Sequence, residues 1–423
     1  MMPLVLSIVI PVPGRNADVA AAIGELRREV VALGVTAEIV VAGHDLTRLA
    51  AAIAGADARA AKAAAPGFGP ALRAGLDAAR GRYVLTVDAE CGDAAIAARD
   101  LWESRDAAEI IVASRYVPGA RARMSVPRRI ASRTVNAIFS RGLSLPVTDL
   151  SSAFRLYRGD VLRQQQLRAE DYDVLPEILV RAMAGGWRVH EIPLRIDLAR
   201  RDRSLSPLVR LGVSYARTFG SLWQLRNSIK AGDYDARAHD SIIPLQRYWQ
   251  RQRYKHITEM MAGQGAVLDV GCGSSKIIGA LPAGSVALDI LPNKLRYARR
   301  YGKPLVHGSG FTLPFADASF PCVLCSQVIE HVPMDSPILS ELDRVLAPGG
   351  RLVLGTPDYD RWEWVYIEKA YGFFKPGGYA DEHIAHYTYQ GLVRRYAALG
   401  YTHEDTRYIL RGELILAFRK PGL

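Results

Sequence analysis

The chain has 423 residues, of which 49% are hydrophobic and 23% are charged, and this length predicts two or three globular domains. The composition excludes disordered and collagen-like proteins, and no apolar run is long and uncharged enough to predict a membrane-spanning helix. The net charge of +11 falls mainly on residues 1–230, which hold 32 Lys and Arg against 23 Asp and Glu. Such a basic region indicates an anionic partner.

The four cysteines are too few for a disulfide framework, which suits a reducing cytoplasm. Cys322 and Cys325 form an isolated C-x-x-C pair inside an apolar run. A zinc site would need two further ligands at similar spacing, so we expect this pair in the hydrophobic core. The apolar residues 1–12 lack a basic region, and they predict a first strand instead of a signal peptide.

The first half of the chain alternates predicted strands with predicted helices. Strands are expected at 4–12, 38–42 and 83–88, and helices at 18–33, 45–65 and 70–80. This alternation predicts a parallel, doubly wound α/β sheet, in which ligands bind at the carboxyl ends of the strands.

The second half begins the same alternation again. Strands are expected at 266–270, 286–289, 322–326 and 351–355. Residues 231–241 between the halves are rich in Asp and lack apolar periodicity, and we place a linker there. We therefore predict two doubly wound α/β domains, at 1–230 and 242–423.

A glycine-rich motif follows the first strand of the second half. Residues 267–273 read Val-Leu-Asp-Val-Gly-Cys-Gly, an apolar strand that ends in a turn through which the backbone can approach a ligand. The next strand ends in Asp289, an acid that can accept hydrogen bonds from ribose hydroxyls. These features predict a nucleoside cofactor. NAD is the rival, but its G-x-G-x-x-G motif is interrupted here by Lys276.

The order of motifs over residues 245–420 resembles the class I methyltransferases that use S-adenosylmethionine. Besides the glycine motif, the resemblance rests on residues 306–315, 320–332 and 346–351. It implies that the cofactor is bound by Asp269, Gly271, Cys272, Gly273, Asp289, Ile290, Ser309 and Gly310. Ser309 departs from the family's pattern, because many relatives carry an acid there.

Methyl transfer from a sulfonium depends mostly on positioning, but an oxygen acceptor must also lose a proton. Residues 359–387 combine aromatic residues with acids and histidines, and we expect a lid over the acceptor. A packed helical hairpin with solvated charges is the alternative. We expect His383 to be the base, because imidazole titrates near neutral pH. His331 is the rival, and Glu330 completes this catalytic set.

Two acids, Asp88 and Glu90, follow the third predicted strand of the first half. Carboxylates at a strand end can hold Mg²⁺ or Mn²⁺ against a diphosphate, although a capped turn has the same pattern. Further motifs lie at 113–116, 128–136, 149–157, 171–177 and 188–193. In this order, residues 5–230 resemble family-2 glycosyltransferases of the dolichyl-phosphate mannose synthase type, which implies a GT-A fold.

This resemblance implies sugar transfer from a nucleotide sugar to a lipid-linked or glycan acceptor, such as a polyprenyl phosphate. The implied residues are Pro11, Val12, Asp88, Glu90 and Arg115 for the nucleotide sugar, Asp88 and Glu90 for the metal, and Arg129, Ser151 and Arg155 for the acceptor phosphate. Residues 13–15 and 42–45 depart from the family's pattern, because acids expected near the donor are missing. Donor recognition is therefore altered, or the domain no longer turns over.

Residues 203–226 predict an amphipathic helix, which either lies on an anionic membrane surface or docks on its own domain. Nucleic acid is disfavoured as the anionic partner, because no nucleic-acid-binding module is recognised. We expect a cytoplasmic protein, peripheral to the membrane, that joins methyl transfer to sugar transfer in the synthesis of a cell-surface glycan or glycolipid. The alternative is a methyltransferase with a non-catalytic, glycosyltransferase-like docking domain.

Overall fold

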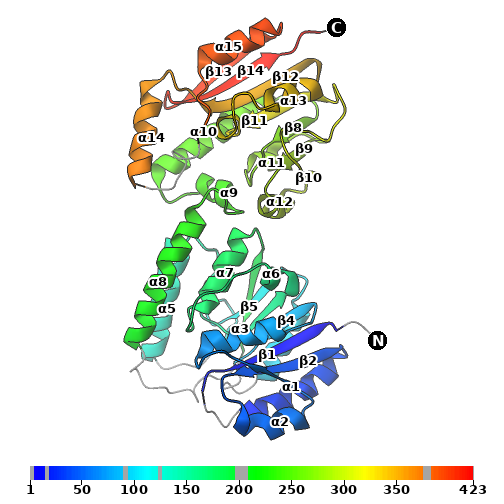
Figure 1. Ribbon diagram of the computed structural model, residues 1–423, viewed down its shortest axis with the longest axis vertical. Coiled ribbons are helices and arrows are strands. Elements are labelled where there is room, and N and C mark those ends of the chain that lie inside the picture. Colours follow the sequence, from blue (N-terminus) through cyan, green and yellow to red (C-terminus); the bar gives the residue numbers. More distant parts are fainter. Residues whose placement is uncertain are drawn as a thin grey trace. The chain divides into compact units, whose positions relative to one another are not determined.

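The computed structural model describes residues 4–14, 19–88, 94–121, 126–195, 208–374 and 383–422. The chain divides into two compact units, which Figure 1 shows coloured along the sequence. The N-terminal unit comprises Met1–Met183 and Trp187–Arg226, and the C-terminal unit comprises Ala184–Gly186 and Asn227–Leu423. Each unit is a mixed α/β structure built on its own seven-stranded sheet.

The N-terminal unit contains seven strands and eight α-helices among its described residues. The strands are β1 (Leu6–Val12), β2 (Ala37–Gly43), β3 (Arg59–Lys62), β4 (Tyr83–Thr86), β5 (Ile110–Ser114), β6 (Arg155–Arg158) and β7 (Val189–Pro193). The helices are α1 (Val19–Leu33), α2 (Ala50–Gly55), α3 (Phe68–Ala78), α4 (Ala94–Glu103), α5 (Val126–Gly142), α6 (Gly159–Arg163), α7 (Val174–Ala184) and α8 (Leu208–Asn227), with a 3-10 turn η1 (Thr47–Leu49).

The strand order of this sheet is β3-β2-β1-β4-β6-β5-β7. Most neighbours are parallel, as the sequence predicts, but β6 runs antiparallel to both β4 and β5. The order reverses between β1 and β4, and a reversal of this kind opens a crevice at the carboxyl ends of the two strands. The structure therefore places the end of β1 and the end of β4 at the same edge of the sheet.

The sequence predicted a single helix over the Ala-rich segment 45–65, and this prediction was wrong. The segment forms η1 and α2 and then continues into β3. Ala61 lies in register with Ala42 on the neighbouring β2. Backbone hydrogen bonds to a sheet edge here override the helix propensity of alanine, which is only a weak preference in a tertiary context.

Successive residues of the central strand β1 face opposite sides of the N-terminal sheet. Ile8 and Ile10 pack into a core cluster that includes residues of α1 and α4. Val9 packs into a second cluster that includes residues of α3, α5 and α7. Successive side chains of the strand face opposite helical layers, and both layers are apolar where they meet the sheet. A continuous apolar run is therefore needed in such a strand.

The C-terminal unit contains seven strands and seven α-helices among its described residues. The strands are β8 (Val267–Val270), β9 (Val286–Asp289), β10 (Leu305–His307), β11 (Phe320–Ser326), β12 (Leu346–Pro357), β13 (Thr402–Ile409) and β14 (Glu413–Arg419). The helices are α9 (Tyr234–His239), α10 (Pro244–Met261), α11 (Ile277–Ala280), α12 (Pro292–Ala298), α13 (Ile338–Val345), α14 (Trp362–Phe374) and α15 (Tyr389–Ala398), with 3-10 turns η2 (Arg299–Tyr301) and η3 (Ile329–His331).

The strand order of the second sheet is β10-β9-β8-β11-β12-β14-β13. The first five strands are parallel, and β14 runs antiparallel to β12 and β13. The order reverses between β8 and β11, so the loops after these two strands meet at the switch point. Cys322 and Cys325 are buried in β11, which confirms that they are core residues.

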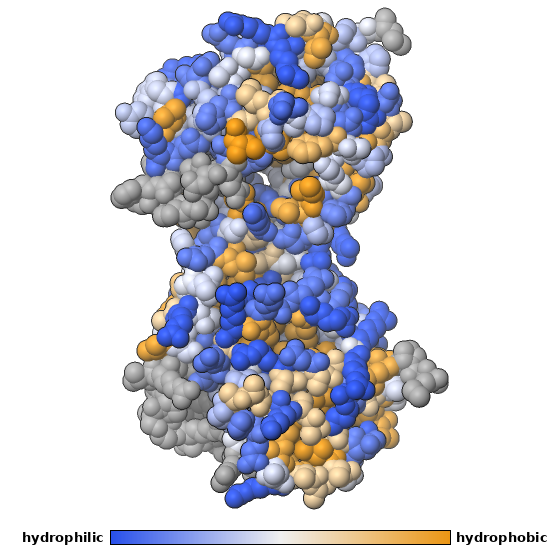
Figure 2. All heavy atoms as spheres, in the orientation of Figure 1, coloured by the Kyte–Doolittle hydropathy of each residue, from blue (hydrophilic) through white to orange (hydrophobic). Residues whose placement is uncertain are grey.

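The segment 231–241, predicted as a linker, instead contains the helix α9 and belongs to the C-terminal unit. The side chains of three of its residues are buried, so this short helix packs against the rest of its unit: Tyr234, Ala236 and Ala238. Among the described residues, none of the helices is long and apolar enough to cross a membrane. The visible face of each unit mixes hydrophilic and hydrophobic residues (Figure 2).

Candidate functional site

The glycine-rich loop after β8 forms one wall of a cavity in the C-terminal unit. Gly271 and Gly273 both have left-handed backbone conformations, with φ of 73° and 58°. A Cβ atom on Gly271 would lie 2.2 Å from a methyl carbon of Val328, so a side chain cannot be accommodated there. The loop can take this path only because glycine tolerates it, and its bare backbone faces the cavity.

Asp289, at the end of β9, is fixed against this loop by two backbone amides. Its carboxylate accepts hydrogen bonds from Gly273 at 2.8 Å and from Leu291 at 2.7 Å. Burial raises the pKa of Asp289 above its usual value, although these two hydrogen bonds oppose the shift. Each carboxylate oxygen keeps a second lone pair, and Asp289 lines the cavity, so it can accept further hydrogen bonds from a ligand.

The cavity has a volume of about 580 Å³, which suits a ligand of cofactor size. Its lining includes every residue predicted to bind the cofactor, namely Asp269, Gly271, Cys272, Gly273, Asp289, Ile290, Ser309 and Gly310. His331 from η3 also lines it. The structure thus brings the ends of β8, β9 and β10 together with the loop after β11, as the switch point requires.

At the end of β11, two buried polar side-chain atoms have no hydrogen-bond partner among the described residues. These are the hydroxyl oxygen of Ser326 and the amide nitrogen of Gln327, whose residues both line the cavity. Gln327 also has a φ of 60°, an uncommon conformation for a residue other than glycine. Buried polar groups are normally hydrogen-bonded, so this edge of the cavity fits a polar ligand.

The cavity is lined by the acidic side chains of Asp235, Asp269 and Asp289 and by the basic side chains of Lys230, Arg253 and Lys294. Burial, with a further contribution from Asp289, raises the pKa of Asp269 to about 8. A cation beside the two carboxylates would favour their ionised forms, because opposite charges at short range lower the pKa of an acid.

Helix α9 contributes a contact that the sequence analysis missed. The carboxylate of Asp235 accepts hydrogen bonds from the backbone amide of Ser274 at 2.9 Å and from the Lys294 ammonium at 2.9 Å. Burial opposes ionisation of Asp235, but Lys294 holds its pKa below the usual value. The signal available in the sequence was the helical spacing of Tyr234 and Ala238, which marks a packed helix face.

The three residues predicted to be catalytic lie together beside this cavity. A carboxylate oxygen of Glu330, one ring nitrogen of His331 and one of His383 all lie within 4.8 Å of one another. Glu330 and His331 come from η3, and backbone amides of Ile384 and Ala385 donate to the Glu330 carbonyl oxygen at 2.9 and 3.1 Å. The main chain around His383 is thereby fixed beside η3.

Glu330 is completely buried, and burial raises its pKa to about 8. One carboxylate oxygen accepts a 3.2 Å hydrogen bond from the Thr356 hydroxyl, whereas the other has no hydrogen-bond partner in the part of the chain that the structure describes. Burial and the neighbouring His331 lower the pKa of His383, so its imidazole favours the neutral form. Thr356 was missed by the sequence analysis, because nothing in the sequence marks it apart from its place at a strand end.

Nδ1 of His383 belongs to a triangle of polar contacts. It lies 3.0 Å from the Glu368 carboxylate and 2.9 Å from the Tyr359 hydroxyl, and that hydroxyl donates to Glu368 at 2.8 Å. The carboxylate can only accept, so Nδ1 carries the proton and Nε2 carries the lone pair. The indole ring of Trp364 stacks on the imidazole at 5.9 Å between centroids.

The predicted lid, residues 359–387, is described only in part. Helix α14 provides Glu368 and the buried Trp364, whereas Trp362 and Tyr366 on the same helix are exposed. Residues 375–382 lie outside the described part of the chain, and with them Asp381, Glu382 and Tyr379. The described contacts place the rings of Tyr359 and Trp364 against His383.

In the N-terminal unit, the predicted donor residues lie at the ends of neighbouring strands. Pro11 and Val12 end β1, and Asp88 follows β4 and is buried. The backbone amide of Val87 donates to the Val9 carbonyl at 3.2 Å, which continues the pairing of the two strands toward this edge. Glu90, the second predicted metal ligand, lies outside the described residues.

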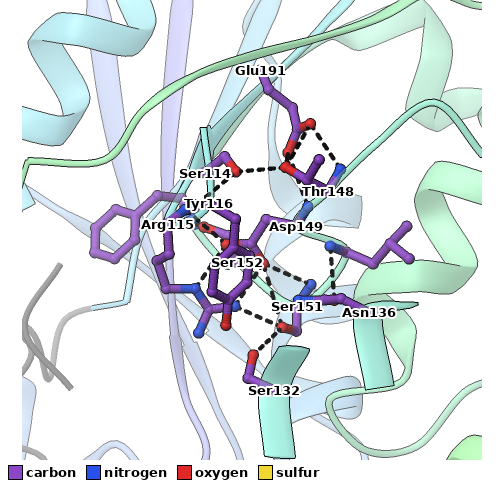
Figure 3. Close-up of polar contacts among 12 residues, drawn as sticks. Ser114, Arg115, Tyr116, Ser132, Asn136, Thr148, Asp149, Ser151, Ser152 and Glu191 are labelled. Carbon is purple, nitrogen blue, oxygen red and sulfur yellow. Dashed lines mark hydrogen bonds and ion pairs between the residues drawn. The ribbon is translucent and has the colours of Figure 1, made fainter. Parts of the chain in front are cut away.

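Arg115 lies in a dense polar network in the N-terminal unit (Figure 3). Its guanidinium donates two hydrogen bonds to Asp149, at 2.7 and 2.6 Å, and one to the Ser151 hydroxyl at 2.6 Å. The Ser132 hydroxyl lies 3.3 Å from that of Ser151. Burial opposes ionisation of Asp149, but Arg115 lowers its pKa. Arg115 is thus already paired with a carboxylate, as a bidentate fork suits.

Arg155 does not have the role that the sequence analysis gave it. Its side chain is fully buried, and it donates to the backbone carbonyls of Leu175 and Leu150, both at 2.6 Å. It therefore ties two backbone segments to β6 from inside the core, where an acceptor phosphate has no access. Arg129 on α5 is exposed and remains the predicted phosphate-binding arginine that faces solvent.

The predicted amphipathic helix 203–226 corresponds to α8. Its residues 203–207 lie outside the described part of the chain. Tyr215 and Leu222 are buried, and the Tyr215 and Phe219 rings contact the Phe139 ring edge-on at 5.6 and 5.2 Å. The apolar face is therefore docked within its own unit, while Arg217 is exposed. The docked alternative is the one that the structure adopts.

Comparison with known proteins finds similarities for the part of the chain that surrounds the cavity. Residues 268–354 match the family model described as a methyltransferase domain. A methyltransferase of Mycobacterium sp. strain KMS is 34% identical over 139 residues, which are 32% of this chain and 53% of that protein. The demethylmenaquinone methyltransferase of Shouchella clausii is 34% identical over 129 residues, 27% of this chain and 54% of that protein.

An uncharacterised protein of a Streptomyces fradiae transposon is 39% identical over 106 residues, which are 22% of this chain and 31% of that protein. The chain spans about half the length, or less, of these curated relatives. Among solved structures, the magnesium protoporphyrin IX methyltransferase of Synechocystis is 16% identical, with a TM-score of 0.35 over 43% of this chain and 89% of that one. Within the C-terminal unit, the part of the chain that matches a methyltransferase domain therefore holds the glycine-rich loop, Asp289 and the strands β8 to β11.

Proposed function

We propose that the C-terminal unit binds S-adenosylmethionine in the cavity at the β8–β11 switch point and transfers its methyl group to an oxygen or nitrogen acceptor. The observation that carries this proposal is the Gly271–Gly273 turn, with Asp289 bonded to Gly273 at its rim. Asp289 would hold the ribose, and the two cavity carboxylates would face the positive charges of the cofactor. Bound there, the cofactor supplies an activated methyl group.

The acceptor lies, in this proposal, on the side of the cavity where His331 stands. Glu330, His331 and His383 handle the proton that an oxygen acceptor must lose, and the segment 359–387 covers the acceptor. The stacking of Trp364 on His383 supports this, because a water-excluding aromatic wall beside titratable groups is a common arrangement in substrate pockets. Burial and the neighbouring His331 lower the pKa of His383, which favours the neutral imidazole that a base requires.

The cofactor proposal is tested by titration calorimetry of the full-length chain with S-adenosylmethionine. Asp289→Ala should weaken binding at least about tenfold, because a hydrogen bond to a charged group contributes roughly 1.5–3 kcal/mol. Asp317→Ala is the matched control, since Asp317 is an exposed acid of the same unit that pairs with Arg344. Equal affinity in the wild type and the Asp289 variant would refute this assignment.

For the N-terminal unit we propose a GT-A-like domain that binds a nucleotide sugar, with Mg²⁺ or Mn²⁺, and transfers the sugar to a lipid-linked or glycan acceptor. Asp88 beyond β4, beside the end of β1, supports this proposal, since parallel sheets bind ligands at that edge. Arg115 and Ser151, which share a hydrogen-bond network, would bind phosphate groups. Arg129 would bind phosphate from the surface. The competing proposal is a docking domain without turnover.

We expect the protein in the cytoplasm, where a polyprenyl phosphate acceptor would bring it to the inner face of the membrane. The basic charge of residues 1–230 supports an anionic partner of this kind. Because the apolar face of α8 is docked within its unit, such contact would be electrostatic and should weaken as salt rises. Together the two units would act in the synthesis of a cell-surface glycan or glycolipid.

A further inference from the structure

We propose that Glu330, His331 and His383 bind a divalent transition-metal ion beside the methyl acceptor. The proximity of the three side chains supports the ion site itself, whereas the chemistry assigned to the ion rests on the methyl transfer proposed above. One potential ligand atom from each of the three residues lies within 4.8 Å of the other two. Two imidazoles and one carboxylate are the ligands of many catalytic zinc sites and of open iron sites, which keep a position for a substrate.

The unpartnered oxygen of Glu330 is an independent observation that points to a ligand. Glu330 is completely buried, and Thr356 satisfies one of its carboxylate oxygens, while the other has no hydrogen-bond partner among the described residues. A buried carboxylate oxygen without a partner is costly, so its retention needs a cause. A cation between this oxygen and the two neighbouring histidines would satisfy it.

The surroundings of His383 are those of a metal ligand. Its Nδ1 donates to the Glu368 carboxylate at 3.0 Å, and the Tyr359 hydroxyl supports the same carboxylate. A carboxylate that accepts from one imidazole nitrogen orients the ring and leaves the other nitrogen as the ligand atom. Trp364 stacks on the ring and further restricts its rotation.

An ion at this position indicates that the methyl acceptor is a hydroxyl group, because the acidity of a hydroxyl increases strongly when it binds a metal ion. Coordination lowers the pKa of a hydroxyl, so its proton passes to solvent near neutral pH. The resulting oxygen then forms a bond to the methyl carbon as the bond from that carbon to sulfur breaks. The electron pair of the broken bond stays on sulfur, which becomes a neutral thioether. With the ion bound, Glu330, His331 and His383 would therefore promote the loss of this proton as ligands of the ion, and not as bases.

The test is calorimetric titration of the chelator-treated full-length chain with Zn²⁺. Compared with the wild type, His331→Ala and His383→Ala should each lose one zinc equivalent, and Glu330→Gln should lose it without a change in side-chain size. Glu368→Gln should weaken the same site by roughly 10- to 100-fold. His386→Ala is the matched control, because His386 stacks on Tyr359 but contributes no atom to the cluster.

Zinc bound elsewhere in the chain is common to all of these proteins, so the difference between them reports this cluster. Identical titrations for the wild type and the His383 variant would overturn the proposal, as would an equal loss in the His386 control. Each variant is also titrated with S-adenosylmethionine, which verifies that its fold is intact. Cofactor binding without a zinc difference would refute the ion site alone, whereas zinc binding without cofactor binding would refute the methyl transfer.

Discussion

The carboxylate of Asp235 and the ammonium group of Lys294 form an ion pair of 2.9 Å, although 58 residues separate them in the sequence. The same carboxylate accepts hydrogen bonds from the amide and hydroxyl of Ser274. A Cβ atom on Gly273 would lie 2.5 Å from it. Helix α9 thus holds the glycine-rich loop from outside the sheet, and the conformation of that loop depends on it.

Asp235→Ala should loosen the glycine-rich loop and weaken cofactor binding. The substitution leaves the largely buried Lys294 without its partner, which costs about 3–5 kcal/mol in pairs of this kind. Hydrogen–deuterium exchange over residues 271–276 should become faster. Asp240→Ala is the control, because Asp240 forms a more exposed pair with Lys276. Unchanged exchange in the Asp235 variant would contradict the role given to α9.

The stability of the C-terminal unit should fall as pH rises toward 8. The folded-state pKa of Asp269 is about 8, against an ordinary value of 3.8, so the folded chain binds more protons than the unfolded chain between these values. Stabilisation by this group is therefore complete below pH 3.8 and is lost as pH rises through the folded pKa. The unfolding transition of the C-terminal unit is recognised because S-adenosylmethionine raises its midpoint temperature. Asp269→Asn should make this midpoint temperature less dependent on pH. A wild-type slope in the variant would exclude Asp269 as its source.

Nucleotide diphosphates should bind the N-terminal unit only with Mg²⁺ or Mn²⁺ and with little selectivity for the base. A carboxylate beside a diphosphate repels it unless a cation lies between them, and the acids expected near residues 42–45 are missing. Calorimetry with several nucleotides, with and without metal, measures this. Asp88→Ala should abolish binding, whereas Asp77→Ala, an exposed acid on α3, should not. An absence of binding under all conditions would favour the docking domain.

Arg155→Ala should destabilise the N-terminal unit and have no selective effect on phosphate. It removes a buried side chain and leaves the carbonyls of Leu150 and Leu175 without their donor, a cost of about 2–5 kcal/mol. Arg129→Ala should change stability by less than about 0.5 kcal/mol, because its side chain is exposed. Thermal denaturation of both variants separates these outcomes, and a stable Arg155 variant would contradict the core role.

Much of the fold follows from periodicity, because a strand between two helical layers needs a continuous apolar run. Strands such as β1, β8 and β9 lie within one or two residues of the predicted ranges. The antiparallel strands β6 and β14 were not predicted, since direction depends on where the chain crosses the sheet and not on local composition. The Ala-rich β3 was mistaken for helix because pairing at a sheet edge leaves no mark in its sequence.

The sequence by itself determined the glycine turn and the acid at the end of the next strand, because backbone conformation and spacing along adjacent strands are local properties. It also determined the candidate residues of the histidine cluster. Only the tertiary structure decided which of them meet, since His331 and His383 are far apart in the chain and approach through hydrogen bonds to the Glu330 carbonyl. Burial decided the rest: of the two arginines predicted to bind the acceptor phosphate, Arg155 lies in the core and Arg129 is exposed.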